Sequence, residues 1–69
     1  MDDRDIKRIE AHLKTTFGNG AIALKARPKI KDSAEVYVGE EFVGVVSDDE
    51  DEDGSFSFTM AILAEDLSA

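Results

Sequence analysis

The chain of 69 residues has no cysteine, no tryptophan, one proline and one histidine. Without cysteine no disulfide can stabilise so small a chain. The longest mostly apolar run covers residues 60–64, far short of the ~18 residues that indicate a membrane span. No apolar stretch follows a basic start, so no signal peptide is expected. These absences predict a cytoplasmic protein with no membrane partner.

Patterns of catalytic residues are also missing. His12 is the only histidine, and nothing around it supplies the nucleophile or orienting acid that a general base needs. No serine lies in a nucleophile elbow. Gly18 and Gly20 follow a predicted helix, whereas a phosphate-binding loop precedes one. The sequence therefore predicts a protein that is not an enzyme and holds no cofactor.

Basic residues are absent after residue 31. Eight basic and four acidic residues before that point give +4, and the twelve acidic residues after it give −12, hence the net charge of −8. This sign repels phosphate backbones, so no nucleic acid partner is expected. Four alternating basic residues could form a stripe that binds phosphates or an acidic partner: Lys25, Arg27, Lys29 and Lys31. No aromatic lies between them, and a solvated strand face is favoured.

The first segment has the spacing of a helix over residues 3–17. Apolar residues recur at intervals of 3, 4 and 4 and share one helix face: Ile6, Ile9, Leu13 and Phe17. Asp2 or Asp3 is suited to cap the start, and Gly18 to end the helix.

Period-two alternation then predicts four strands over residues 21–27, 34–38, 41–47 and 55–63. Pro28 ends the first, residues 29–33 form a polar connection, and Gly39-Glu40 is a two-residue hairpin turn. Short connections favour pairing in chain order. The predicted fold is a single α+β domain over residues 1–69, with one N-terminal helix packed on a four-stranded antiparallel meander.

The hairpin turn assigns the two sheet faces. It places Tyr37 opposite Phe42 and Val36 opposite Val43, so Val43 and Val45 join the core face. The other face then carries Tyr37, Phe42 and Val46. Because one helix covers only one face, these three residues are a candidate surface for a protein partner or for self-association. Alternatively, the two aromatics form a cross-strand pair that stabilises the hairpin.

The loop before the fourth strand is strongly acidic. Asp49, Asp51, Asp53 and Gly54 match the first half of a calcium loop, in which alternating carboxylates converge on a hard cation. The second half fails, because the twelfth position is Met60 where a bidentate glutamate belongs. The favoured interpretation is a solvated hairpin loop, with a calcium site at the three aspartates as the alternative.

Short sequence segments, in a fixed order along the chain, resemble a family of short alphaproteobacterial proteins, domain of unknown function 3126. They span nearly the whole chain: residues 16–19 (TFGN), 27–29 (RPK), 32–45 (DSAEVYVGEEFVGV), 51–58 (DEDGSFSF) and 60–63 (MAIL). The resemblance implies a small bacterial cytoplasmic protein and supplies no activity. The sequence thus predicts a non-enzymatic interaction module or homodimer that uses the open sheet face, with weak calcium binding as the alternative.

Overall fold

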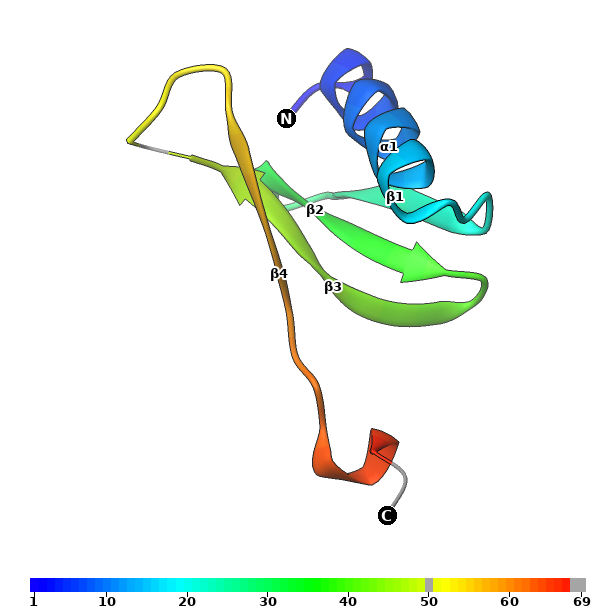
Figure 1. Ribbon diagram of the computed structural model, residues 1–69. Helices are drawn as coiled ribbons and strands as arrows, with labels where there is room; N and C mark the ends of the chain where they lie inside the picture. The colour runs from blue at the N-terminus through cyan, green and yellow to red at the C-terminus, as the bar shows by residue number, and fades with distance from the viewer. Residues whose placement is uncertain (50, 68–69) are drawn as a thin grey trace.

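The computed structural model describes residues 1–49 and 51–67. One helix precedes four antiparallel strands in the order β1-β2-β3-β4, which confirms the predicted fold (Figure 1). None of the helices in this part of the chain is both long and apolar enough to cross a membrane. The elements are α1 (Asp3–Phe17), β1 (Ile22–Arg27), β2 (Ile30–Val38), β3 (Glu41–Asp48), β4 (Phe56–Met60) and the short 3-10 helix η1 (Ala64–Asp66).

Local sequence sets both ends of α1. The Asp2 carboxylate accepts a hydrogen bond from the Asp5 N–H at 2.8 Å, as an N-cap does. At the other end Gly18 has φ 60° and ψ 37°, and its N–H donates to the carbonyls of Lys14 and Thr15. This left-handed conformation costs glycine little and satisfies carbonyls that the helix leaves unpaired.

The connection between β1 and β2 is shorter than the sequence suggests. Pro28 and Lys29 form a tight turn that brings Arg27 opposite Ile30, so β2 begins at Ile30 rather than at residue 34. Ala26 pairs with Ala34 but Arg27 pairs with Ile30, so residues 31–33 of β2 have no partner on β1 and the register shifts at this point. The predicted polar connection over residues 29–33 is therefore corrected: residues 30–33 lie in β2.

The register between β2 and β3 changes the predicted faces. Tyr37 lies opposite Phe42 as predicted, but Val36 lies opposite Gly44, because one extra residue of β3 enters the ladder there. A bulge of this kind reverses the alternation of every residue that follows it. Val46 is consequently buried in the core, 1% exposed, and Val45 lies on the open face. The placement of Val46 on the open face and of Val45 in the core is wrong.

Gly44 allows β4 to approach β3 at this bulge. A Cβ on Gly44 would lie 2.5 Å from the carbonyl oxygen of Thr59 and 2.7 Å from the Phe58 ring. The ring occupies the space that a β3 side chain would otherwise fill. Glycine is the residue that permits such close approach.

The core lies between α1 and one sheet face, and α1 packs mainly on β1 (Figure 1). The side of this face that belongs to β4 is covered less completely, since Phe56 and Phe58 are only partly buried. The buried apolar cluster consists of Leu13, Ile22, Leu24, Ala34, Val36 and Val46.

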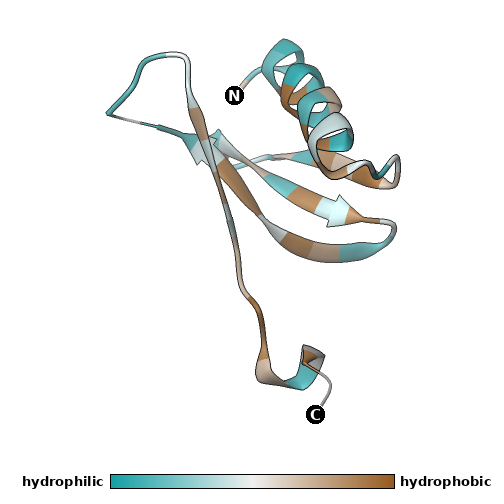
Figure 2. Ribbon diagram, in the orientation of Figure 1, coloured by the Kyte–Doolittle hydropathy of each residue, from teal (hydrophilic) through white to brown (hydrophobic). Residues whose placement is uncertain are grey.

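The chain leaves the sheet after Met60. β4 ends opposite Gly44, three residues before the predicted end and next to the bulge at Val43. Residues 61–67 are here called the C-terminal segment. Ala61 and Ile62 still border Phe42 of β3, and the rest of the segment runs away from the helix and the sheet (Figure 1). Much of this run is hydrophobic (Figure 2). The molecule is accordingly elongated, with principal extents of 40 × 23 × 22 Å.

Candidate interaction surface

The first edge of the sheet, β1, is occupied by the protein itself. The Glu10 carboxylate of α1 accepts a hydrogen bond from the outward-facing N–H of Leu24 at 2.9 Å. Lys14 lies 3.4 Å from the other oxygen of Glu10. The hydrogen bond from Leu24 and the nearby ammonium of Lys14 lower the pKa of Glu10, against the opposing effect of its partial burial. An ionised side chain thus caps this edge.

Further residues protect the β1 edge from pairing with another strand. Lys25 is exposed and Arg27 is half-buried, and Pro28 follows directly. Charged side chains and proline are common means by which natural sheets prevent edge-to-edge association. β1 is therefore unsuited to add a further strand.

The opposite edge, β4, has none of these features. The N–H of Asp49 donates to the carbonyl of Ser55 at 3.0 Å, which sets the alternation of the β3–β4 ladder. By that alternation the backbone groups of Phe56, Phe58 and Met60 point away from β3 toward the free side. The ten residues from Ser55 to Ala64 include no charged residue and no proline, in a chain that is 35% charged. This edge is open to strand addition.

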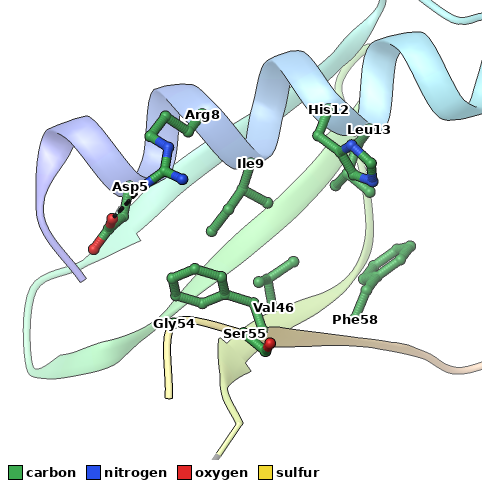
Figure 3. Close-up of a pocket in the computed structure, with 10 residues that line it drawn as sticks. Asp5, Arg8, Ile9, His12, Leu13, Val46, Gly54, Ser55 and Phe58 are labelled. Carbon is green, nitrogen blue, oxygen red and sulfur yellow. Dashed lines mark ion pairs between the residues drawn. The ribbon is translucent and has the colours of Figure 1, made fainter. Parts of the chain in front are cut away.

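A groove lies along the same edge, between α1 and β4. Its first part has a volume of about 390 Å³. Figure 3 shows Ile9 and Leu13 of α1 above Val46 and Phe58 of the sheet. Polar side chains stand at the rim: the Arg8 guanidinium is 3.8 Å from the Asp5 carboxylate. The walls are hydrophobic and the rim is charged, as at many binding surfaces.

The groove continues toward the C-terminal end of α1. This second part, of about 200 Å³, shares Leu13 and Phe58 with the first. Its mouth is formed by Phe17 and Met60, which are 58% and 49% exposed. We call both parts together the apolar groove; its apolar lining is Ile9, Leu13, Phe17, Ile22, Val38, Val43, Val46, Phe56, Phe58 and Met60.

Exposed apolar side chains continue from the mouth of this groove into the C-terminal segment. Large hydrophobic residues exposed in the described part of the chain lie mainly from Met60 onward, where Ile62 reaches 68% exposure. A small protein seldom exposes adjoining apolar residues unless they serve an interface. The members from Met60 onward are Met60, Ile62, Leu63 and Leu67.

The residues predicted as the partner site are separated by the fold. The Tyr37 and Phe42 rings meet edge to face on the open face, with centroids 5.7 Å apart, whereas Val46 lies further along β3 and is buried in the core on the other face. The Lys25 ammonium lies 4.5 Å from the centre of the Tyr37 ring. The Tyr37 hydroxyl donates to the Glu35 carboxylate at 3.0 Å. These internal contacts favour the alternative interpretation, an aromatic pair that stabilises the hairpin.

The hydrogen bond to Glu35 also affects ionisation. It is the main cause of a raised pKa for Tyr37, with partial desolvation and the negative charge of Glu35 acting in the same direction.

The acidic loop does not bring its predicted ligands together. Asp49 directs one carboxylate oxygen to the N–H of Asp51 at 3.0 Å, and the backbone closes the loop through Glu52 and Ser55. Within residues 1–49 and 51–67, no three acidic or histidine side chains are grouped as metal ligands would be. The arrangement is that of a hairpin loop, and Asp53 lies exposed in it.

His12 lies at the rim of the groove. Its Nε2 is 3.3 Å from the Thr16 hydroxyl, one helical turn further along α1. Only Thr16 is found within hydrogen-bonding distance of the ring among the described residues, and a threonine does not orient a general base as a carboxylate would.

The bare edge was missed by reasoning from sequence, although a signal for it was present. The uncharged run from Ser55 to Ala64 contrasts with the charged residues of β1. The predicted meander already made the first and fourth strands the edges; the interpretation also required knowing that α1 lies nearer to β1 and caps its edge.

Fold and surface together define a small α+β domain, a helix on an antiparallel meander with one bare edge. Comparison with family patterns matches residues 5–66 to the family described as protein of unknown function (DUF3126). The chain belongs to this family, which confirms the resemblance seen in the sequence. Neither the curated proteins nor the solved structures contain a match to the chain.

Proposed function

We propose that this protein is a non-enzymatic interaction module whose working surface is the apolar groove together with the free edge of β4. One observation carries the proposal: unpaired backbone groups, an uncharged strand and exposed apolar side chains occur at the same edge. Strand addition combines these elements, since the backbone supplies hydrogen bonds and the side chains supply buried area.

The two surfaces predicted from sequence are less suited to this role. Tyr37 is engaged by Lys25, Glu35 and Phe42 of its own sheet. At the acidic loop, the Asp49 carboxylate already accepts a hydrogen bond from the backbone. A weak calcium site would be supported only if millimolar calcium shifted amide signals of the loop residues in a titration followed by NMR.

The test compares two lysine substitutions of similar starting exposure. Met60→Lys places a charge at the β4 edge, where the wild-type side chain is 49% exposed. Phe42→Lys places the same charge on the open face, where the wild-type side chain is 52% exposed. Tagged wild type and both variants are cross-linked in native lysate and the bound proteins, further copies of the chain included, are identified by mass spectrometry.

We expect Met60→Lys to lose the cross-linked species and Phe42→Lys to retain them, because Met60 lies on the β4 edge and in the groove, whereas Phe42 borders Met60 only from β3 and lies outside the groove. Circular dichroism should show that both variants are folded. If only Phe42→Lys loses the cross-linked species, the open face is the working surface. If wild type and both variants retain these species equally, both surfaces are excluded.

A further inference from the structure

We infer that the partner of the β4 edge is the β4 edge of a second copy of this chain, paired antiparallel about a two-fold axis at Phe58. The two four-stranded sheets then form one sheet of eight strands. The inference rests on the proposed function, because it names the occupant of the same surface.

The backbone geometry supports this register. The outward backbone groups belong to Phe56, Phe58 and Met60, and Phe58 is the midpoint of β4. Antiparallel pairing centred on Phe58 places each Phe56 opposite Met60 of the second copy. All three outward-facing residues of both strands then find partners, whereas a centre shifted by one residue leaves one of them outside β4.

The same two-fold rotation brings the apolar grooves of the two copies next to each other. Directly opposite residues lie on the same face of a sheet, so the apolar side chains of the two β4 strands meet across the junction. Continuing in this register, Ile62 would come opposite Gly54 of the second copy. Gly54, Phe56 and Ile9 line one end of the groove, and a Cβ on Gly54 would meet no atom within 4 Å. There is therefore room for the C-terminal segment of each copy beside the groove of the other.

The available area suits a dimer. Each exposed large apolar side chain offers on the order of 100 Å². Met60 lies on this edge, Phe17 lines the groove beside it, and three more belong to the C-terminal segment. With that segment packed against the second copy, each copy contributes roughly 500 Å² and both together about 1,000 Å², the size at which specific interfaces begin. The contributing side chains are Phe17, Met60, Ile62, Leu63 and Leu67. The partly exposed Phe56 and Phe58 and the strand backbone add to this area.

The lack of charge on β4 favours an uncharged partner strand. Residues 55–64 carry no charge, although Asp49 and Asp53 lie near Phe56 and Glu41 lies near Met60. A charge brought to the centre of the strand, beside Phe58, would lose hydration without gaining an ion pair. The β4 strand of a second copy is itself uncharged, so within residues 56–60 two chains of net charge −8 can meet without opposing like charges directly. Because Glu10 and the basic residues protect β1, pairing stops at two copies and does not propagate into a filament.

Sedimentation equilibrium of purified chain measures the association. We expect twice the chain mass of 7.5 kDa. Met60→Pro removes an N–H that points to the free side, a position at which an edge strand tolerates proline. This variant should remain folded and sediment as a monomer, whereas the matched Met60→Leu should remain a dimer.

The register is tested by disulfide formation, which the absence of native cysteine makes specific. In the inferred pairing Ser57 lies opposite Thr59 of the second copy, in a pair whose Cα atoms are about 4.5 Å apart. That distance is within the range of a disulfide. Mixing Ser57→Cys with Thr59→Cys under mild oxidation should give a heterodisulfide. Mixing Ala23→Cys with Lys25→Cys, on β1, should not.

The outcomes separate the inference from the proposed function. A wild type of 7.5 kDa at high concentration would overturn the inference. So would a dimer that survives Met60→Pro, or one that forms no disulfide between positions 57 and 59. If the chain is a monomer and Met60→Lys still loses a cross-linked protein, the proposed function stands and only the identity of the partner is wrong.

Discussion

The Glu10 carboxylate on α1 accepts a hydrogen bond from the N–H of Leu24 on β1 at 2.9 Å. This contact ties the helix to the sheet across fourteen residues of sequence, and it occupies a backbone donor at the β1 edge. The two edges of one small sheet are therefore unequal: β1 is capped by an ionised side chain, and β4 presents unpaired backbone groups beside hydrophobic residues.

Replacement of Glu10 should weaken the attachment of the helix. We expect Glu10→Ala to lower the free energy of unfolding by about 1–2 kcal/mol, because the Leu24 N–H loses a charged acceptor at a partly buried site. Urea denaturation at a fixed chain concentration measures the loss. Glu10→Gln keeps an oxygen acceptor and should lose less; equal losses for both would show that the contact depends on charge alone.

The contribution of Glu10 should depend on pH. Its pKa is lowered in the folded protein, mainly by the hydrogen bond from Leu24, so the folded state favours the ionised carboxyl. The stabilisation is present above the pKa of the unfolded chain and is lost as pH falls through the folded pKa. The difference in stability between wild type and Glu10→Gln should thus shrink on acidification, and a constant difference from neutral to acid pH would contradict this assignment.

Val45 and Val46 provide a matched test of the bulge. Val46 is 1% exposed, so Val46→Ala should cost about 2 kcal/mol or more through lost burial and an unfilled cavity. Val45→Ala, on the open face, should cost clearly less. Thermal or urea unfolding distinguishes the two variants. A larger loss of stability for Val45→Ala would indicate that β2 and β3 pair without the bulge.

Gly44 should not accept even a methyl group. Its Cβ would meet the Thr59 carbonyl oxygen and the Phe58 ring at 2.5 and 2.7 Å. The carbonyl belongs to the backbone of β4, so Gly44→Ala must displace that strand, at a cost of about 1–3 kcal/mol. Hydrogen exchange should show the loss of protection in β4 before β1 and β2. Uniform loss over all strands would indicate that β4 is not displaced locally.

The ionisation of Tyr37 can be followed by absorbance without interference, because the chain has no other tyrosine and no tryptophan. Its hydroxyl donates to Glu35, and this hydrogen bond raises the pKa of Tyr37 above the usual range. A titration followed by tyrosinate absorbance should therefore show that Tyr37 ionises at a higher pH than a free tyrosine. Glu35→Gln should lower the pH at the midpoint of this titration. An unchanged midpoint in Glu35→Gln would mean that another group raises the pKa.

Elements specified by local chemistry could be predicted from the sequence. The helix spacing, the Asp2 cap and the left-handed Gly18 each depend on neighbouring residues, and they appear as expected. The hairpin turn after Val38 likewise places Tyr37 opposite Phe42. These features involve residues close together along the chain, whose preferences act before any long-range contact forms.

The candidate surface depended on longer-range structure. The bulge that moves Val46 into the core and Val45 out of it arises where Gly44 lets the Phe58 ring approach from another strand. No local pattern distinguishes this register from a regular one, because the apolar residues on both sides of Gly44 suit either face.

The sequence by itself therefore determined the helix, the four strands, their order and the uncharged character of residues 55–64. Only the tertiary structure decided which residues of β3 face the core, that the helix caps the β1 edge, and that the helix lies nearer to β1 than to the uncharged strand. The physical reason is that secondary structure follows from local propensity and spacing. A free sheet edge, by contrast, is defined by which strands and helices pack against one another.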